Sequence, residues 1–438
     1  MTKTTISEFR EAVYQKVVWR PAAIMDLVDA LTIAGHVSSP VALSESPLFR
    51  RKFSSVYDAL VHGELSNELK SLFRDSQDTG WETIAGYEVH AVDATANERM
   101  SAETLADRGV LKAQQKEAVR YGHKYSWLVR LVQRGTSWVA PEDIQRISTV
   151  TTDTKVAAQQ VKVCALHNQR AKVITADSRY RDHHFLGVFA GLENTFALVR
   201  LQNNQKLSQE PVPKPEGSRG APRKHGPGFQ LTAIEREPDA LEEFYLGKQK
   251  VRVRVWHKLH FKRLAKVQGS VVCVEFLKED GTPRYKRPLW LFWTGPEEVA
   301  PQDLCRMYLW RFAIEHLFRF LKQHLGLNCH RSSNLTSLQR WMWIVALAYW
   351  QLLLLRDTVQ SNRPAWHPHK KDGQDMPLTP SQVQRSTQTF LLQSGSPASD
   401  PRPAGKGAGR QKGYRPSPRQ RYEIVFKTKK TQTRPKTC

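Results

Sequence analysis

The chain has 438 residues, of which 40% are hydrophobic, so it is long enough for two or three domains with a sizeable core. Its 66 Lys and Arg residues against 42 Asp and Glu give a net charge of +24, which points to a polyanionic partner such as nucleic acid. A basic tail on a neutral protein is the alternative, because residues 401–438 hold 12 Lys or Arg and one acid. Removing that net +11 from +24 leaves +13 on the remainder, which favours a distributed binding surface.

Cysteine usage and the apolar segments exclude several classes of protein. The five cysteines are scattered and none forms a Cys-x-x-Cys pair, so neither a disulfide framework nor a zinc ribbon is supported. Residues 1–16 are polar and lack the apolar core of a signal peptide. The most apolar run, residues 341–355, is short for a bilayer span, and we interpret it as a buried helix. We therefore expect a soluble, intracellular protein without a membrane partner.

The first half of the chain shows two different patterns. Residues 1–80 have helical periodicity, which leaves open whether they form a small DNA-binding domain or a helical cap. Residues 85–200 mix strand-like and helical segments, as is typical of an α/β unit. Within this unit, "YEVHAVDAT" and "AKVITADSRY" predict strands that end at Asp93 and Asp177, and "TDTKVAAQQVKVCALH" predicts a helix between them.

The second half of the chain predicts a β-rich block, a helical segment and a tail. The block spans residues 201–298 and holds three strand-like segments, with a turn at "EDGTPR". Residues 299–358 are expected to be helical and to complete the α/β unit. Residues 359–438 are rich in Pro, Ser, Gly and basic residues, a composition that predicts a basic, disordered, low-complexity tail.

Residues 307–327 predict one amphipathic helix with an unusual polar stripe. At about 100° per residue, four polar side chains fall within roughly 60° of one another, namely Tyr308, Arg311, Glu315 and Lys322. Large apolar residues occupy the other side of the helix. We expect a core face with a ridge of polar side chains beside it.

Three acids are candidate metal ligands. Asp93 and Asp177 end predicted strands, and Glu315 lies on the polar stripe. Mg²⁺ takes a few carboxylate oxygens and keeps positions for water and phosphate, and two such ions can activate a nucleophile in phosphoryl transfer. Sequence spacing does not show that the three acids converge. An ordinary alternative is that Glu315 only forms helix salt bridges with Arg311 and Arg319, each four residues away.

The spacing Y-x2-R-x3-E-x6-K on the polar stripe resembles the signature of DDE transposases of bacterial insertion sequences. The likeness is to the subgroup that has a Tyr-Arg-Glu-Lys motif and a β-strand insertion before the last acid. "HAVDAT" with Asp93 resembles the segment of the first catalytic acid, and "ITADSRY" with Asp177 resembles that of the second. The long interval before Glu315 holds the β-rich block, and the resemblance covers roughly residues 85–330.

The resemblance implies a fold, a site and partners. The fold would be an α/β ribonuclease-H-like catalytic domain interrupted by the β-rich insertion. Two Mg²⁺ ions, for which Mn²⁺ can substitute, would be held by Asp93, Asp177 and Glu315. The phosphates of the transposon end would be contacted by Tyr308, Arg311 and Lys322, whose side chains are all hydrogen-bond donors. The partner would be double-stranded DNA, both terminal repeats and target, bound by a homodimer in the cytoplasm at the bacterial nucleoid.

The function implied is metal-dependent DNA cleavage at the ends of an insertion sequence, followed by strand transfer into target DNA. Two alternatives stay open from the sequence. One is a ribonuclease-H-like nuclease that cuts without joining strands. The other is a non-catalytic, DNA-binding relic of a transposase.

Overall fold

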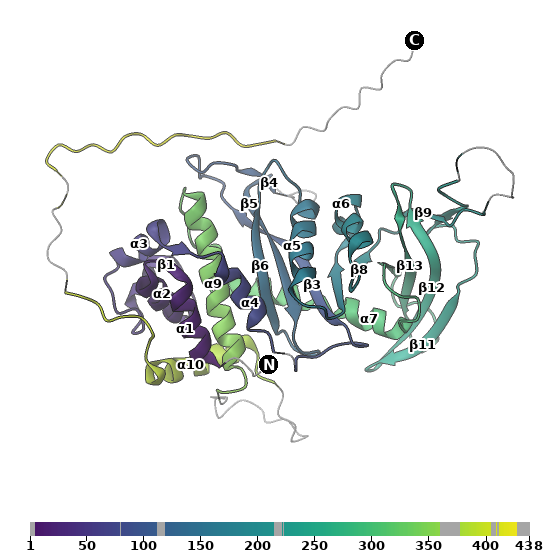
Figure 1. Ribbon diagram of the computed structural model, residues 1–438, viewed down its shortest axis with the longest axis horizontal. Helices are drawn as coiled ribbons and strands as arrows, with labels where there is room; N and C mark the ends of the chain where they lie inside the picture. The colour runs from purple at the N-terminus through teal and green to yellow at the C-terminus, as the bar shows by residue number, and fades with distance from the viewer. Residues whose placement is uncertain are drawn as a thin grey trace, which may run out of the picture.

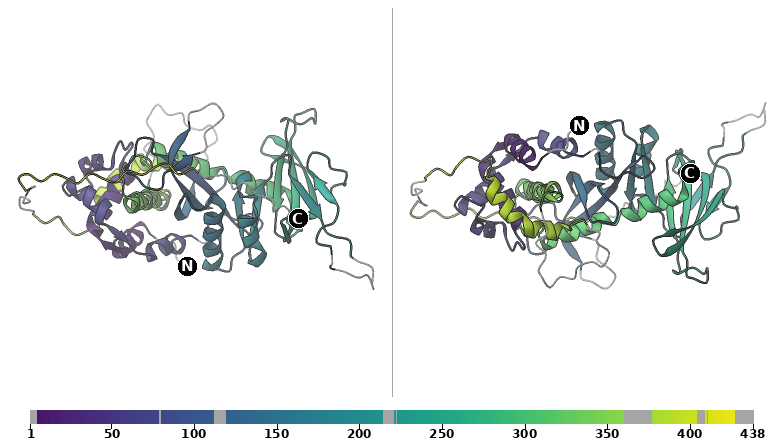
Figure 2. Two further views of the ribbon diagram at one scale, coloured as in Figure 1. Left: turned by 90° about the horizontal axis from the view of Figure 1, so that it is seen from above. Right: turned by 90° about the horizontal axis from the view of Figure 1, so that it is seen from below.

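A computed structural model describes residues 5–78, 80–111, 119–213, 221, 223–359, 377–403, 409 and 411–426. A mixed sheet of twelve strands runs through the molecule in the order β10-β9-β12-β13-β14-β8-β7-β3-β5-β4, with β11 paired to β12 and β6 paired to β5. Helices gather at one end of the molecule and the β-rich block forms the other (Figures 1 and 2). A small second sheet pairs β1 (Val17–Trp19) with β2 (Glu64–Leu65).

The centre of the large sheet is the α/β unit. Here β7 (Lys172–Ala176) lies between β3 (Glu88–Glu98) and β8 (Thr195–Arg200), and the three strands are parallel. All five residues of β7 are buried, as expected for a parallel strand covered on both faces. The predicted helix between the acids is α5 (Asp153–His167), and it lies beside these strands (Figure 1). The remaining strands of this part are β4 (Gly109–Leu111), β5 (Arg120–Leu131) and β6 (Val139–Ile147).

The prediction that a strand ends at Asp93 is wrong. β3 continues to Glu98, because residues 94–98 find hydrogen-bonding partners along the antiparallel strand β5. Asp93 therefore lies within a strand that has neighbours on both sides. Asp177, by contrast, directly follows the last residue of β7, as predicted.

The three predicted strands of the β-rich block are confirmed as β12 (Gln249–Phe261), β13 (Leu264–Phe276) and β14 (Leu289–Trp293). Gly281 supplies a positive φ of 77° in the predicted turn between β13 and β14. β14 pairs antiparallel with β8, so the block extends the central sheet and does not form a separate one. The smaller strands, which the sequence did not reveal, are β9 (Lys206–Gln209), β10 (Gly228–Gln230) and β11 (Ala240–Leu246).

The helical end of the molecule is built around α9 (Leu335–Leu355), which contains the predicted buried helix 341–355. The ring of Phe73 stacks against Trp343 and Trp350, with both centroid distances 5.4 Å. The region 1–80 therefore shares its core with a helix from far along the chain. Its helices are α1 (Ile6–Lys16), α2 (Pro21–Ile33), α3 (Ser54–His62) and α4 (Glu68–Asp75). Within the described ranges, no helix is long and apolar enough to cross a membrane.

The tail predicted to be mostly disordered, residues 359–438, contains an ordered helix, α10 (Pro380–Ser394). Val383, Thr387 and Leu391 recur every four residues and are buried against the helical core. Gln384 Nε2 also donates to the carbonyl oxygen of Ala34 at 2.8 Å. The amphipathic pattern of α10 is hidden in a composition dominated by polar residues, which is why composition alone predicted disorder. Much of the remaining predicted tail lies outside the described residues.

The prediction of one continuous helix over residues 307–327 is also wrong. α7 (Pro301–Trp310) and α8 (Ala313–Gln323) are separated at Arg311 and Phe312. The Arg311 N–H donates to the Tyr308 carbonyl at 3.1 Å, a three-residue spacing that tightens the turn. The two helices then pack on different strands, α7 on β8 and β12 and α8 on β3 and β6. The regular rotation of about 100° per residue, from which the polar stripe was predicted, is therefore interrupted at Arg311 and Phe312.

Candidate active site

Two of the predicted acids are neighbours because of the strand register. β3 and β7 pair in parallel with Val92 opposite Ala176, so the next residues, Asp93 and Asp177, follow side by side. Each carboxylate is also held locally. Asp93 Oδ1 accepts the N–H of Ala94 at 2.7 Å, and Asp177 Oδ1 accepts that of Arg179 at 2.8 Å.

The break between α7 and α8 brings a guanidinium and the third acid to this place. Arg311 Nη1 lies 3.6 Å from Asp93 Oδ2, and Arg311 Nη2 donates to Glu315 Oε1 at 2.9 Å. The same guanidinium lies 5.7 Å from the ring centroid of Tyr308. The helix salt bridge between Arg311 and Glu315 does form, but Arg311 also joins Glu315 to an acid of the central sheet. A salt bridge between neighbouring helix residues therefore does not account for all the contacts of Arg311.

The electrostatics of the group show an excess of negative charge. The pKa of Asp93 is raised to about 6, first by burial and then by the charge of Asp177, and Glu315 adds to the effect. The N–H of Ala94 and the charge of Arg311 act in the opposite direction. Arg311 contacts two of the three carboxylates, those of Asp93 and Glu315, and an additional cation would relieve the repulsion among the three. The side chains of Asp93 and Glu315 remain 25% and 40% exposed, so an ion from solvent can reach them.

The other two residues of the predicted stripe lie in different environments. Tyr308 is buried, which raises the pKa of its phenol, and the charge of Arg311 opposes that rise. Lys322 is exposed near the end of α8, where the acid that acts on it is Glu98, the last residue of β3. The structure thus brings together five of the predicted site residues: Asp93, Asp177, Tyr308, Arg311 and Glu315. Lys322 on α8 lies apart from them, toward the end of β3 that carries Glu98.

Basic residues beside Asp177 were missed by the sequence reading. Arg179 forms an ion pair with Asp153, the first residue of α5. Ser178, which follows Asp177, borders a hollow of about 890 Å³ that is also lined by Arg200 and Arg287. Arg200 is the last residue of β8, which runs parallel to β7, and a basic residue at that strand end was a signal available in the sequence.

One protein-family model matches part of the chain. A family model described as the transposase DDE domain matches residues 141–351, a little less than half of the chain. This segment includes Asp177, Arg311 and Glu315, whereas Asp93 precedes it. The match supports a transposase function and an enzyme of the polynucleotidyl transferase type.

Among solved structures, the chain is similar to one described as the cryo-EM structure of a piggyBac transposase synaptic complex with hairpin DNA. The identity is 10% and the TM-score 0.42, over 86% of this chain and 77% of that chain. No curated protein matches the sequence.

Proposed function

We propose that this protein is a transposase that cleaves DNA at the ends of an insertion sequence and transfers the strands into target DNA. The observation that carries the proposal is the group formed by Asp93, Asp177 and Glu315 around Arg311, inside a chain whose residues 141–351 match the transposase DDE domain. DDE transposases are generally dependent on divalent metal ions.

The three acids fit a divalent metal site. Their oxygens are the ligands that Mg²⁺ and Mn²⁺ prefer, and the raised pKa of Asp93 reflects a repulsion that cations would relieve. Two ions held by Asp93, Asp177 and Glu315 would activate a water or a 3′-hydroxyl and stabilise the leaving oxygen of the phosphodiester. Arg311 would keep Glu315 oriented toward Asp93 while the metal ions bind.

The surroundings of the acids favour a phosphate chain as the substrate. Arg311 and Tyr308 offer a guanidinium and a phenol beside the acids, and both groups donate hydrogen bonds to phosphate oxygens. The hollow that begins at Ser178 carries Arg200 and Arg287, which would continue the path of the DNA backbone. Lys322 would contact a phosphate farther along β3, beyond the reacting one.

Further assignments belong to the same proposal. The central strands form a ribonuclease-H-like catalytic core within residues 85–200 and 299–358, with residues 201–298 as its insertion. The subgroup is that of bacterial insertion sequences with the Tyr-Arg-Glu-Lys motif, and the protein works at the nucleoid. Both ends of the element are held by a homodimer, with residues 1–80 contributing to DNA binding.

The test is a strand-cleavage and joining assay with Mg²⁺ or Mn²⁺, on DNA that carries the two flanks of the gene. Wild type is expected to cleave and join, and Glu315→Gln to lose both activities while it still binds DNA. Asp303→Asn is a matched control, because Asp303 is a partly buried acid on α7 that pairs with Arg306 and not with the site.

The other results overturn the proposal in distinct ways. Cleavage without joined product in wild type would identify a nuclease. Tight DNA binding without chemistry in wild type would identify a relic of a transposase. Full activity in Glu315→Gln would remove the acid group from the mechanism.

A further inference from the structure

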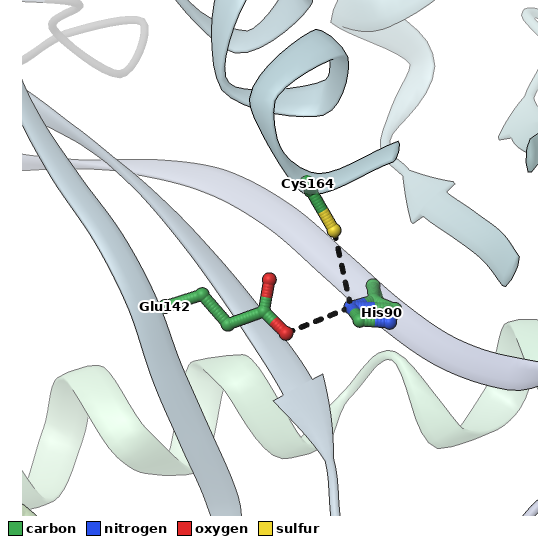
Figure 3. A group of neighbouring side chains, drawn as sticks. All are labelled: His90, Glu142 and Cys164. Carbon is green, nitrogen blue, oxygen red and sulfur yellow. Dashed lines mark hydrogen bonds and ion pairs between the residues drawn. The ribbon is translucent and has the colours of Figure 1, made fainter. Parts of the chain in front are cut away.

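A second group of ionisable side chains lies on the other side of the central sheet. His90 of β3, Glu142 of β6 and Cys164 of α5 point toward one another (Figure 3). His90 Nδ1 is 3.3 Å from Glu142 Oε1 and 4.0 Å from Cys164 Sγ. Among the described residues, this is the group of three potential metal ligands whose ligand atoms all lie within 4.8 Å of one another. We call it the sealed cluster, because all three residues are at most 3% exposed.

Hydrogen bonding within the protein satisfies this cluster only in part, since Glu142 Oε1 accepts from Gln77 Nε2 at 2.5 Å while other polar atoms are left over. His90 lies between two carboxylates, with Nδ1 facing Glu142 and Nε2 3.7 Å from Glu88 Oε2. The pKa of His90 is held well below its usual value by burial and by the charges of Arg130 and Lys172, so the ring is neutral and has one N–H to offer. His90 Nε2, Glu142 Oε2 and Glu88 Oε2 are buried without a hydrogen-bond partner among the described residues. Such atoms are rare in folded proteins and call for a missing partner.

We propose that His90 Nδ1, the Glu142 carboxylate and Cys164 Sγ bind a zinc-class transition metal ion. A nitrogen, an oxygen and a sulfur ligand are the set that Zn²⁺ accepts, whereas Mg²⁺ favours oxygen alone. Ordinary zinc bond lengths place tetrahedral ligands about 3.3 to 3.8 Å apart. The 3.3 Å between His90 Nδ1 and Glu142 Oε1 lies in this range, and the 4.0 Å from His90 Nδ1 to Cys164 Sγ lies just outside it. The site needs only a small inward movement of Cys164 to close.

The charges around the sealed cluster are compatible with a dication. Burial raises the pKa of the Cys164 thiol well above its usual value, and Glu142 adds to this, so binding would displace the thiol proton. The thiolate and the Glu142 carboxylate would then balance the two charges of the ion. Arg130 already faces Glu88 at 3.4 Å, and Lys172 Nζ donates to the side-chain oxygen of Asn168 at 2.6 Å.

Glu88 has a supporting place in this site. When Nδ1 of His90 binds the ion, Nε2 carries the proton and points it toward the Glu88 carboxylate. A carboxylate behind a metal-binding histidine fixes the orientation of the ring and makes it a stronger ligand. The ion would thus engage the Glu142 carboxylate, whose Oε2 is unpaired, and would direct the unpaired Nε2 of His90 toward Glu88.

The sealed cluster would act as a structural site. Its ligands come from β3, β6 and α5, so the ion would fix the helix to the sheet directly behind the strand that carries Asp93. It differs from the proposed catalytic site in its ligands, since Asp93, Asp177 and Glu315 provide oxygen only. This inference does not depend on the transposase proposal.

The test uses cobalt as a spectroscopic probe on the full-length protein. A Co²⁺ ion bound to a thiolate gives a charge-transfer absorption band that an oxygen-only site cannot give. After metal removal and titration with Co²⁺, wild type is expected to develop this band at one equivalent per chain and to lose it when Zn²⁺ is added. Cys273→Ser is the matched control, a buried cysteine on β13, and is expected to keep the band.

Cys164→Ser is expected to lose the band and one equivalent of bound zinc, measured by elemental analysis. Glu315→Gln is expected to keep both, which separates this site from the proposed catalytic one. Wild type without a thiolate band overturns the inference, and this result does not depend on whether any variant folds. A band that persists in Cys164→Ser also overturns it, because the thiolate would come from another cysteine.

Discussion

The two faces of β3 carry two clusters of ionisable residues that differ in their access to water. Asp93 and His90 are three residues apart on the strand, so their side chains point to opposite faces of the sheet. The face of Asp93 meets Arg311 and Glu315 at the break between α7 and α8 and stays partly open. The face of His90 is covered by α5 and closed to solvent.

The difference shows how exposure decides what a polar cluster can do. On the open face, acids that repel one another are tolerated because water and mobile ions offset part of their charge. On the closed face, each unpaired polar atom costs free energy that only a fixed partner can recover. The open cluster therefore suits exchangeable ions and a substrate, and the closed cluster suits one permanent ligand.

The largest expected effect comes from Asp93→Asn. We expect strand cleavage to fall by roughly 10³-fold or more, since loss of a metal-binding carboxylate removes several kcal/mol of stabilisation of the transition state. The variant should nevertheless be more stable than wild type at pH 8, because a repelled charge is gone. Cleavage rates and denaturant unfolding at that pH measure the two effects. A variant that is inactive and also less stable would contradict the account of Asp93 as a repelled acid.

Cys164→Ser tests the closed face. We expect the free energy of unfolding to fall by about 1–3 kcal/mol, as a buried hydroxyl without its ligand replaces a metal-bound sulfur. A chelator should lower the unfolding temperature of wild type by more than that of the variant, as measured by calorimetry. Cys273→Ser serves as the buried-cysteine control. Equal responses of wild type and Cys164→Ser to the chelator would argue against a bound ion.

The free energy of unfolding should depend on pH through Asp93, the repelled acid of the open face. Its pKa is raised from 3.8 to about 6 in the folded protein, so its stabilising contribution is present below pH 3.8 and is lost as pH rises through 6. The loss amounts to about 3 kcal/mol at most. Unfolding measured from pH 4 to 8 should show a steeper decline in wild type than in Asp93→Asn, because the buried acids Asp29 and Glu142 have raised pKa values in both proteins. Cleavage should rise over the same range, because only the ionised carboxylate binds a metal ion.

The smallest expected effect is that of Lys322→Ala, which alters the open face away from the acids. DNA binding should weaken by about 1 kcal/mol, roughly fivefold. The slope of log affinity against log salt concentration should decrease by about one, because one fewer counterion is released on binding. Lys162→Ala, an exposed lysine on α5 behind the sheet, is the control and should change neither. Binding isotherms at several salt concentrations make the comparison. A larger loss in Lys162→Ala would place the DNA on the opposite face.

Several local features were predictable from the sequence. Short stretches of the sequence show the periodicity of several elements, because each pattern depends only on the geometry of one element. These elements are α5, the apolar core of α9, and the strands β12 to β14. The acids Asp93, Asp177 and Glu315 were candidates by their positions, and the resemblance to a family, not their spacing, predicted that they converge. α10 was missed since its few buried residues are diluted by polar ones.

By itself, the sequence determined the basic charge of the chain and the type of its strongly periodic elements, and it nominated three acids as candidates. The tertiary structure alone decided that the β-rich block extends the central sheet, that β3 continues past Asp93 and that the helix breaks at Arg311. It also assembled the sealed cluster, whose members come from two strands and a helix. These features depend on strand pairing and packing between segments distant in sequence, and such contacts leave no local periodicity to read.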